Sequence, residues 1–150
     1  MRAIALLALA AALVSASTAS AEPPATCSLL TRVEVANAIG TRSVTAARRA
    51  AGHSNASCTW TGPGTGTVSE GRPTVRIDIT PVSRSAFLRM SRLTSDAVTV
   101  RGVGELAYRQ RSELAVYDHG YWIEIATVLV GSPAAAQRHL ATLVVKRLTA

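Results

Sequence analysis

The stretch Glu113–Val130, with the sequence ELAVYDHGYWIEIATVLV, decides the fold. It divides into two runs that favour β-strands, and the second is the longest β-branched and aromatic segment of the chain. Between the runs lie Asp118, His119 and Gly120, a combination typical of the tight turn that closes a β-hairpin. The sequence therefore predicts a hairpin of two antiparallel strands at the centre of the protein.

A long helix is expected after this hairpin. Ser132 is suited to cap its start, and Pro133 suits the first helical position. We expect the helix to lie across the inner face of the hairpin, with apolar residues at helical spacing facing the sheet. The apolar stripe comprises Ala136, Leu140, Leu143, Val144 and Leu148, and the residues outside it are Gln137, Arg138, Thr142 and Lys146.

The N-terminal half of the domain contains a second well-marked helix. Thr31 and Glu34 form a capping box at its start, and Gly40 supplies its end. The segment that follows, 43–57, is rich in alanine and arginine, which favour a further short helix before a loop.

Two segments in the middle of the chain complete the predicted fold. Residues 73–80, PTVRIDIT, alternate between apolar and polar side chains, as expected for a strand with one wet face. After Pro81, Ser83 can cap an amphipathic helix whose arginines are expected to lie in solvent rather than on a membrane. The apolar face of this helix comprises Ala86, Phe87, Met90 and Leu93. Together these elements predict an α+β fold with two layers, in which an antiparallel sheet of four to five strands has helices packed mainly on one face.

The first residues have the pattern of a secretory signal peptide. Arg2 precedes an apolar core and small residues follow it, so cleavage is expected after Ala21. We therefore divide the chain into a signal peptide, 1–21, and a single exported domain, 22–150, which is secreted, periplasmic or held at the cell envelope. An uncleaved membrane anchor is one alternative, but the apolar core is shorter than the ~20 residues that a spanning helix needs. A lipoprotein anchored at Cys27 is another, although the leucine usual three positions before a lipidated cysteine is absent.

The sequence contains only two cysteines, Cys27 and Cys58. In an exported chain such a pair is expected to form a disulfide, which here would close a loop of about thirty residues. Redox pairs are usually closer in sequence, and a metal site would need further ligands, for which His53 is the candidate within the loop. Because residues 58–61 alternate like a short strand, the disulfide should lie beside Trp60 and tie the helix that begins after Thr31 to the sheet.

The predicted mature domain is basic. Without the signal peptide, fifteen arginine and lysine residues face nine acidic residues, a balance of +6. The basic residues are almost all arginines and are dispersed along the chain, whereas nucleic-acid-binding proteins usually concentrate them on one element. We therefore expect no nucleic-acid partner, and a diffuse attraction to anionic cell-wall or lipid surfaces.

The segment Gly102–Ala107, GVGELA, follows the strand-like run Val98–Val100 and has the G-x-G-x-x-A spacing of a dinucleotide-binding fingerprint. That fingerprint requires a helix and then a parallel strand, whereas this segment leads toward the antiparallel hairpin. We therefore predict no cofactor, and no metal site.

Four groups of residues form a pattern along the predicted mature chain. They are Cys27–Thr31 (CSLLT) with Glu34, Val35 and Gly40, then Cys58–Trp60 (CTW), then Gly102–Tyr108 (GVGELAY), and finally the alanine-rich closing helix. This pattern resembles that of small exported bacterial proteins, mainly actinobacterial, grouped as domain of unknown function 3558. The resemblance implies a small exported domain, often a lipoprotein. Because the family has no established activity or catalytic residues, the resemblance implies no site.

Two classes of function remain open. The sequence contains no G-x-S-x-G or H-E-x-x-H motif and no histidine at ligand spacing from another, so we predict no catalytic residue. A small secreted hydrolase-type enzyme with a site near the hairpin turn, using Asp118 and His119 with His53, is the alternative. We favour a non-catalytic binding or accessory module whose partner is an unidentified envelope component or protein. Its candidate contact surface comprises Tyr117, Tyr121 and Trp122.

Overall fold

The structure is a computed structural model that describes residues 25–50, 56–64 and 71–150, so the predicted signal peptide and His53 lie outside the described residues. Its helices are η1 (Thr26–Ser28, a 3-10 turn), α1 (Arg32–Ile39), α2 (Arg84–Leu93) and α3 (Pro133–Leu148). Its strands are β1 (Thr45–Ala50), β2 (Ala56–Thr61), β3 (Thr74–Pro81), β4 (Val98–Thr99), β5 (Leu106–Gln110), β6 (Glu113–Asp118) and β7 (Tyr121–Val128). Within these described ranges, no helix has the length and apolar character needed to cross a membrane.

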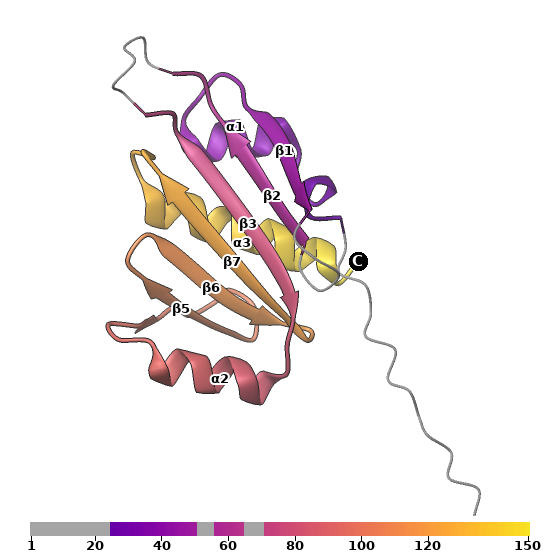
Figure 1. Cartoon of the computed structure of the whole chain (residues 1–150), viewed down its shortest axis with the longest axis vertical. Coiled ribbons are helices and arrows are strands. Elements are labelled where there is room, and N and C mark those ends of the chain that lie inside the picture. Colours follow the sequence, from indigo (N-terminus) through magenta and orange to yellow (C-terminus); the bar gives the residue numbers. More distant parts are fainter. Residues whose placement is uncertain (1–24, 51–55, 65–70) are drawn as a thin grey trace, which may run out of the picture.

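The strands form one antiparallel sheet in the order β1-β2-β3-β7-β6-β5-β4 (Figure 1). The predicted central hairpin is confirmed, because β6 pairs with β7 through the turn at His119 and Gly120. The α+β class is also confirmed. The prediction of four to five strands is wrong, because the sheet has seven. The two that the sequence analysis did not identify are β1 and β5.

The segment that favoured a short helix forms the edge strand β1 instead. All six of its residues pair in register with β2, from Thr45 opposite Thr61 to Ala50 opposite Ala56. Alanine and arginine prefer helices, but the preference of a single residue is a few tenths of a kcal/mol and tertiary pairing overrides it. β1 is therefore determined by its neighbour in the sheet rather than by its own composition.

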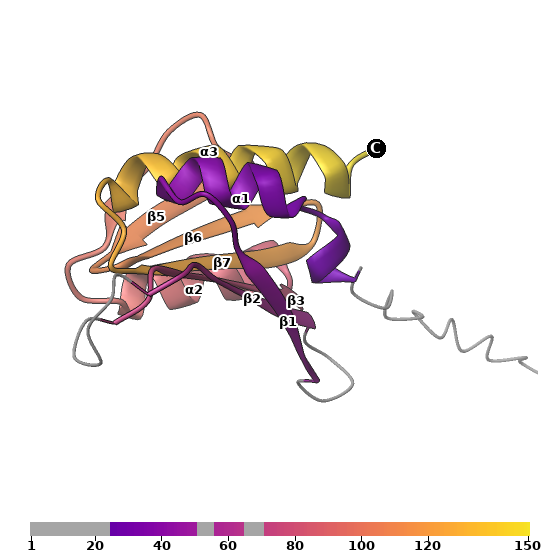
Figure 2. The ribbon, with the colours of Figure 1, turned by 90° about the horizontal axis from the view of Figure 1, so that it is seen from above.

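The main core lies between one face of the sheet and the helices α1 and α3 (Figure 2). Val75, Ile77 and Ile79 of β3 point into it and are fully buried, as their alternation predicted. Cys58 and Trp60 of β2 are fully buried in the same core, which confirms that they share a face.

α1 begins at the predicted capping box. The Thr31 hydroxyl accepts a hydrogen bond from the Glu34 backbone N–H at 3.2 Å, and the Glu34 carboxylate accepts one from the Thr31 N–H at 2.8 Å. Gly40 ends the helix in the left-handed conformation, with a φ of 72°. The Glu34 carboxylate also accepts hydrogen bonds from the Arg147 guanidinium, at 2.5 and 2.8 Å. This ion pair joins the start of α1 to the end of α3.

α3 packs across β6 and β7, as predicted. Pro133 is its first residue, but the Ser132 side chain makes no capping hydrogen bond. Gln137, which the sequence placed outside the apolar stripe, is only 1 % exposed. Its side-chain amide donates hydrogen bonds to the Ser112 carbonyl at 2.6 Å and to the Thr127 hydroxyl at 3.0 Å. Gln137 is therefore a buried polar link between α3 and the sheet.

α2 packs on the face of the sheet opposite α1 and α3 (Figure 2), so this part of the molecule has three layers where two were predicted. Ser83 caps α2 as expected, because its hydroxyl accepts a hydrogen bond from the Ala86 N–H at 3.2 Å. On the predicted apolar face, Phe87 is 1 % exposed, whereas Met90 is 43 % and Leu93 is 75 % exposed. Part of the predicted apolar face of α2 is therefore exposed and is not packed on the sheet.

Cys27 and Cys58 form the predicted disulfide, with their Cα atoms 5.2 Å apart. Cys27 belongs to η1, which contacts β1, β2 and β3. The disulfide therefore ties the segment just before α1 to the sheet, beside the buried Trp60.

Candidate functional site

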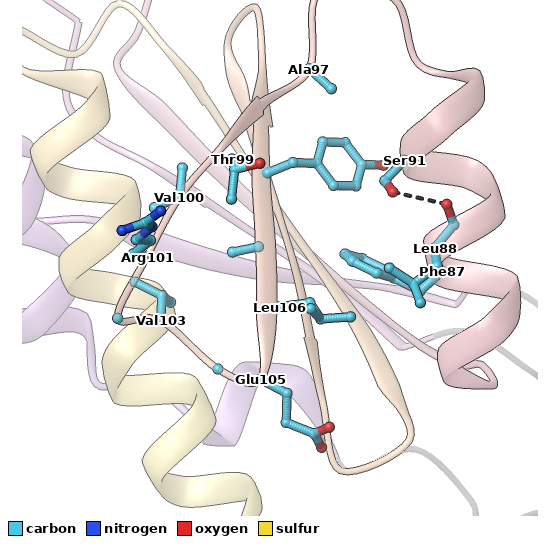
Figure 3. Close-up of a pocket in the computed structure, with 14 residues that line it drawn as sticks. Phe87, Leu88, Ser91, Ala97, Thr99, Val100, Arg101, Val103, Glu105 and Leu106 are labelled. Atoms are coloured by element: carbon cyan, nitrogen blue, oxygen red, sulfur yellow. Dashed lines mark hydrogen bonds between the residues drawn. The ribbon is translucent and has the colours of Figure 1, made fainter.

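A groove lies between α2 and the segment 97–108, at the edge of the sheet formed by β4 and β5 (Figure 3). Its cavity volume is about 360 Å³. The apolar part of its lining includes Phe87 and Leu88 of α2, Val100 and Val103 of the loop before β5, and Leu106 of β5. The Ser91 and Thr99 side chains add hydroxyl groups. The groove therefore exposes apolar and polar surface in nearly equal amounts.

The loop 100–105 closes one side of this groove. Gly102 and Gly104 have φ values of 76° and 58°, a region that favours glycine. A side chain at Gly104 would also meet the Val116 side chain at 2.5 Å and the Tyr117 carbonyl at 2.9 Å. The G-x-G spacing therefore serves a close approach of this loop to β6. The segment continues into strand β5, and not into the helix that a dinucleotide fingerprint requires.

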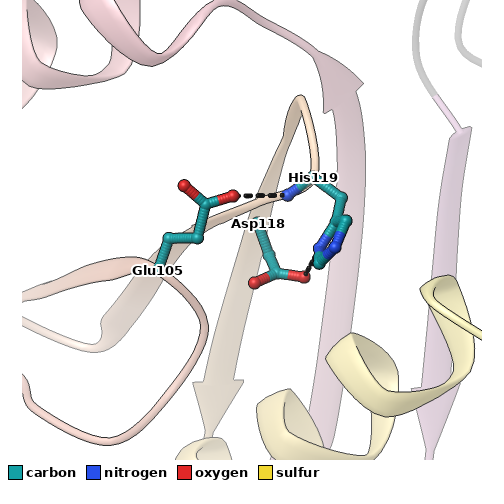
Figure 4. A group of neighbouring side chains, drawn as sticks. All are labelled: Glu105, Asp118 and His119. Atoms are coloured by element: carbon teal, nitrogen blue, oxygen red, sulfur yellow. Dashed lines mark hydrogen bonds and ion pairs between the residues drawn. The ribbon is translucent and has the colours of Figure 1, made fainter.

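This close approach brings Glu105 to the hairpin turn (Figure 4). The Glu105 N–H donates a hydrogen bond to the Tyr117 carbonyl at 3.0 Å, and the Glu105 carboxylate accepts one from the His119 N–H at 3.1 Å. The carboxylate of Asp118, whose side chain is 5 % exposed, lies 2.6 Å from His119 Nδ1. Glu105, Asp118 and His119 each offer a ligand atom within 4.8 Å of the others, a set that could hold a metal ion.

Asp118 raises the pKa of His119 above its ordinary value, first through their hydrogen bond and then through charge attraction. With Nδ1 directed at Asp118, Nε2 is the ring nitrogen left for other partners. Such a pair can orient an imidazole as a general base. Among the described residues, however, no hydrogen bond joins this imidazole to a serine, threonine or cysteine. The predicted third member, His53, lies outside the described residues.

The candidate contact residues are divided between the two faces of the sheet. Tyr117 and Trp122 lie on the α2 face, where they and Tyr108 surround Phe87 with ring centroids 5.4 to 5.7 Å from its own. Tyr121 packs against the core on the other face. Tyr121 and Trp122 are separated in this way because successive side chains of a strand point to opposite faces.

The groove was not predicted from the sequence. Its signals were present as the amphipathic pattern of α2 and the strand-like run before Gly102, but neither indicates which face of the sheet α2 covers. That choice depends on Phe87, which packs among aromatic side chains from three different strands. Sequence spacing carries no information on such a cluster.

Comparison with known proteins adds no relative. No family model matches the chain, and no match is found among the curated proteins or the solved structures. The resemblance to domain of unknown function 3558 stays a prediction, and the site is interpreted from its own geometry.

Proposed function

We propose that this protein is a non-catalytic exported or envelope-associated binding module, and that the groove between α2 and residues 97–108 holds its ligand. The observation that carries the proposal is the groove itself. Its volume of about 360 Å³ falls within the range of small-molecule sites, and its lining combines apolar side chains with polar groups in nearly equal measure. This mixed lining suits a small amphipathic molecule, which has both an apolar and a polar part.

Two features support a place outside the cytoplasm. Disulfides such as Cys27–Cys58 persist mainly in oxidising compartments. The positive balance of the predicted mature domain favours attraction to the anionic surfaces of a bacterial envelope. Arginines on different elements, Arg76 of β3, Arg84 of α2 and Arg147 of α3, are already paired with carboxylates. We therefore propose that this attraction is diffuse and that ligand recognition belongs to the groove.

An NMR titration with octanoate and with indole, as aliphatic and aromatic probes, tests the groove. We expect saturable shifts confined to the backbone amides of α2 and of residues 97–108. Ala97→Leu, which fills one end of the groove, should weaken binding about tenfold or more. Ala135→Leu adds the same side chain at an exposed position of α3 and should leave binding unchanged. Shifts that do not saturate, or equal weakening by both variants, would contradict the proposal.

A hydrolase-type enzyme at the hairpin turn is the second candidate, and the pairing of Asp118 with His119 favours it. Ester hydrolysis by the protein should then require both residues. His119→Asn and Asp118→Asn would each lower the rate by orders of magnitude, as in other sites where an aspartate orients a catalytic histidine. Equal rates in the three proteins would remove this candidate.

A further inference from the structure

A second hollow lies between α2 and the face of β5, β6 and β7 that α2 covers, and has a volume of about 180 Å³. The strand register explains it. Glu124 of β7 is opposite Ala115 of β6, which is opposite Tyr108 of β5, so the three residues form one row across the sheet. Because alanine is the smallest of the three, the row is lowest at its centre. Met90 of α2 lines the hollow from above.

Carboxylates gather around this hollow. Glu113 and Glu124 line it, and Asp78 is the cross-strand partner of Glu124. The Arg76 guanidinium lies 2.7 Å from the Asp78 carboxylate and 3.4 Å from that of Glu124. Among the described residues, no other cation forms a salt bridge with Asp78 or Glu124, and Glu113 forms none. Three carboxylates therefore face one guanidinium, in a domain whose overall balance is positive.

The pKa of Glu124 reflects this crowding of negative charge. Burial raises the pKa of Glu124, and the neighbouring charges of Glu113 and Asp78 raise it further, although Arg76 opposes them. The carboxylates thus remain incompletely neutralised by the residues around them. A second cation at the hollow would relieve this repulsion.

Aromatic groups complete the lining. The Trp122 and Tyr108 rings border the hollow beside the carboxylates, and the faces of such rings attract cations. An ammonium group carries only hydrogen-bond donors, so these rings would contribute their faces and the carboxylates would accept its hydrogen bonds.

We propose that this hollow binds the ammonium group of an alkylamine, with Glu124 and Glu113 as counter-charges and Trp122 and Tyr108 as aromatic walls. The volume of about 180 Å³ suits a short aliphatic ammonium group, whether on a lysine side chain or on a free amine. Tyr108 borders both this hollow and the groove, but Glu113, Glu124 and Trp122 line the hollow alone, so a test read at Trp122 does not depend on the proposed function.

The chain has two tryptophans, so the indole N–H signals in a ¹H–¹⁵N NMR spectrum report on the site directly. Trp122 borders the hollow, and Trp60, buried in the core, is the internal reference. Titration with n-butylammonium chloride at constant ionic strength should shift the Trp122 signal saturably and leave Trp60 unmoved. The neutral isostere n-butanol should have no such effect. N-acetyl-lysinamide, added in a separate arm, distinguishes a peptide-borne amine from a free one, and binding of either supports the site.

Three variants test the assignment. Glu124→Gln removes the half-buried counter-charge and should weaken n-butylammonium binding about tenfold or more. Ala115→Leu should abolish binding because it fills the hollow. Glu105→Gln is the matched control, because it makes the same charge change at the hairpin turn and should leave binding intact.

Several results would overturn the proposal: a Trp122 shift that does not saturate, an equal response to n-butanol, or equal weakening by Glu105→Gln and Glu124→Gln. A dispersed spectrum with an unshifted Trp60 signal shows that each variant is folded. If Glu124→Gln does not fold, the comparison of n-butylammonium with n-butanol on the wild type still shows whether binding requires the positive charge.

Discussion

At the hairpin turn, the buried carboxylate of Asp118 is stabilised by one neighbouring side chain, that of His119. The Asp118 side chain is 5 % exposed, and burial of a carboxylate is costly unless it is paired, so its contact with His119 at 2.6 Å stabilises both groups. This contact raises the pKa of His119 above 6.5. A raised pKa means that the stabilisation is fully present below pH 6.5 and is lost as the pH rises through the folded-state pKa.

We therefore predict that Asp118→Asn lowers the pKa of His119 toward 6.5, because it keeps the side-chain shape and removes the charge. An NMR titration of the imidazole C–H signals measures this value, and the signal of His139 on α3 serves as a reference within the same sample. An unchanged His119 pKa in the variant would contradict the pairing.

The three residues at the hairpin turn, Glu105, Asp118 and His119, were not equally predictable from the sequence. Asp118 and His119 were placed together because turn chemistry is local. Glu105 was not, because a separate loop brings it to the turn, and the contact depends on the close approach that Gly104 permits. The pair Gly102 and Gly104 indicates a backbone with positive φ values, but it does not identify the strand that this loop approaches.

Elements with strong local signals were predicted correctly, and elements that depend on a partner were not. The capping box of α1, the alternation of β3 and the turn between β6 and β7 are all properties of neighbouring residues. β1 became a strand through its pairing with β2, and Gln137 became buried because Ser112 and Thr127 supply its partners. These outcomes depend on residues that are distant in sequence.

The ion pair between α1 and α3 makes the stability of the fold depend on pH. The hydrogen bond from Arg147, together with the capping bond from Thr31, lowers the pKa of Glu34 from 4.5 to about 2. A lowered carboxyl pKa contributes stability that is present above pH 4.5 and is lost as the pH falls toward about 2. We expect Glu34→Gln to cost about 1 kcal/mol at neutral pH, because glutamine can keep the cap but loses the ion pair with Arg147.

Urea unfolding at a series of pH values measures this contribution. Wild-type stability should fall between pH 4.5 and about 2 more steeply than that of Glu34→Gln. Arg147→Gln should flatten the same part of the curve because it removes the main partner. Parallel curves for wild type and both variants would show that the pair between the helices contributes nothing.

Across the whole molecule, the two halves of the sheet are supported differently. β5, β6 and β7 are covered by α2 on one face, and β6 and β7 by α3 on the other. β1 and β2 lie at the opposite edge of the sheet, where the disulfide joins Cys58 to η1. We infer that the disulfide stabilises the half of the sheet that α2 does not cover.

Removal of this disulfide is therefore expected to weaken the whole domain. The bridge closes a loop with a sequence separation of 31 residues, for which the chain-entropy model gives roughly 3 to 4 kcal/mol. Cys58→Ser also leaves a hydroxyl in a fully buried position, so the double variant Cys27→Ala with Cys58→Ala isolates the effect of the bridge more cleanly. We predict that the double variant loses about 2 to 5 kcal/mol of unfolding free energy, measured by urea titration. Reduction of the wild type should reproduce this loss and should leave the double variant unaffected. Equal midpoints for oxidised wild type, reduced wild type and double variant would show that β1 and β2 are held by strand pairing and core contacts alone.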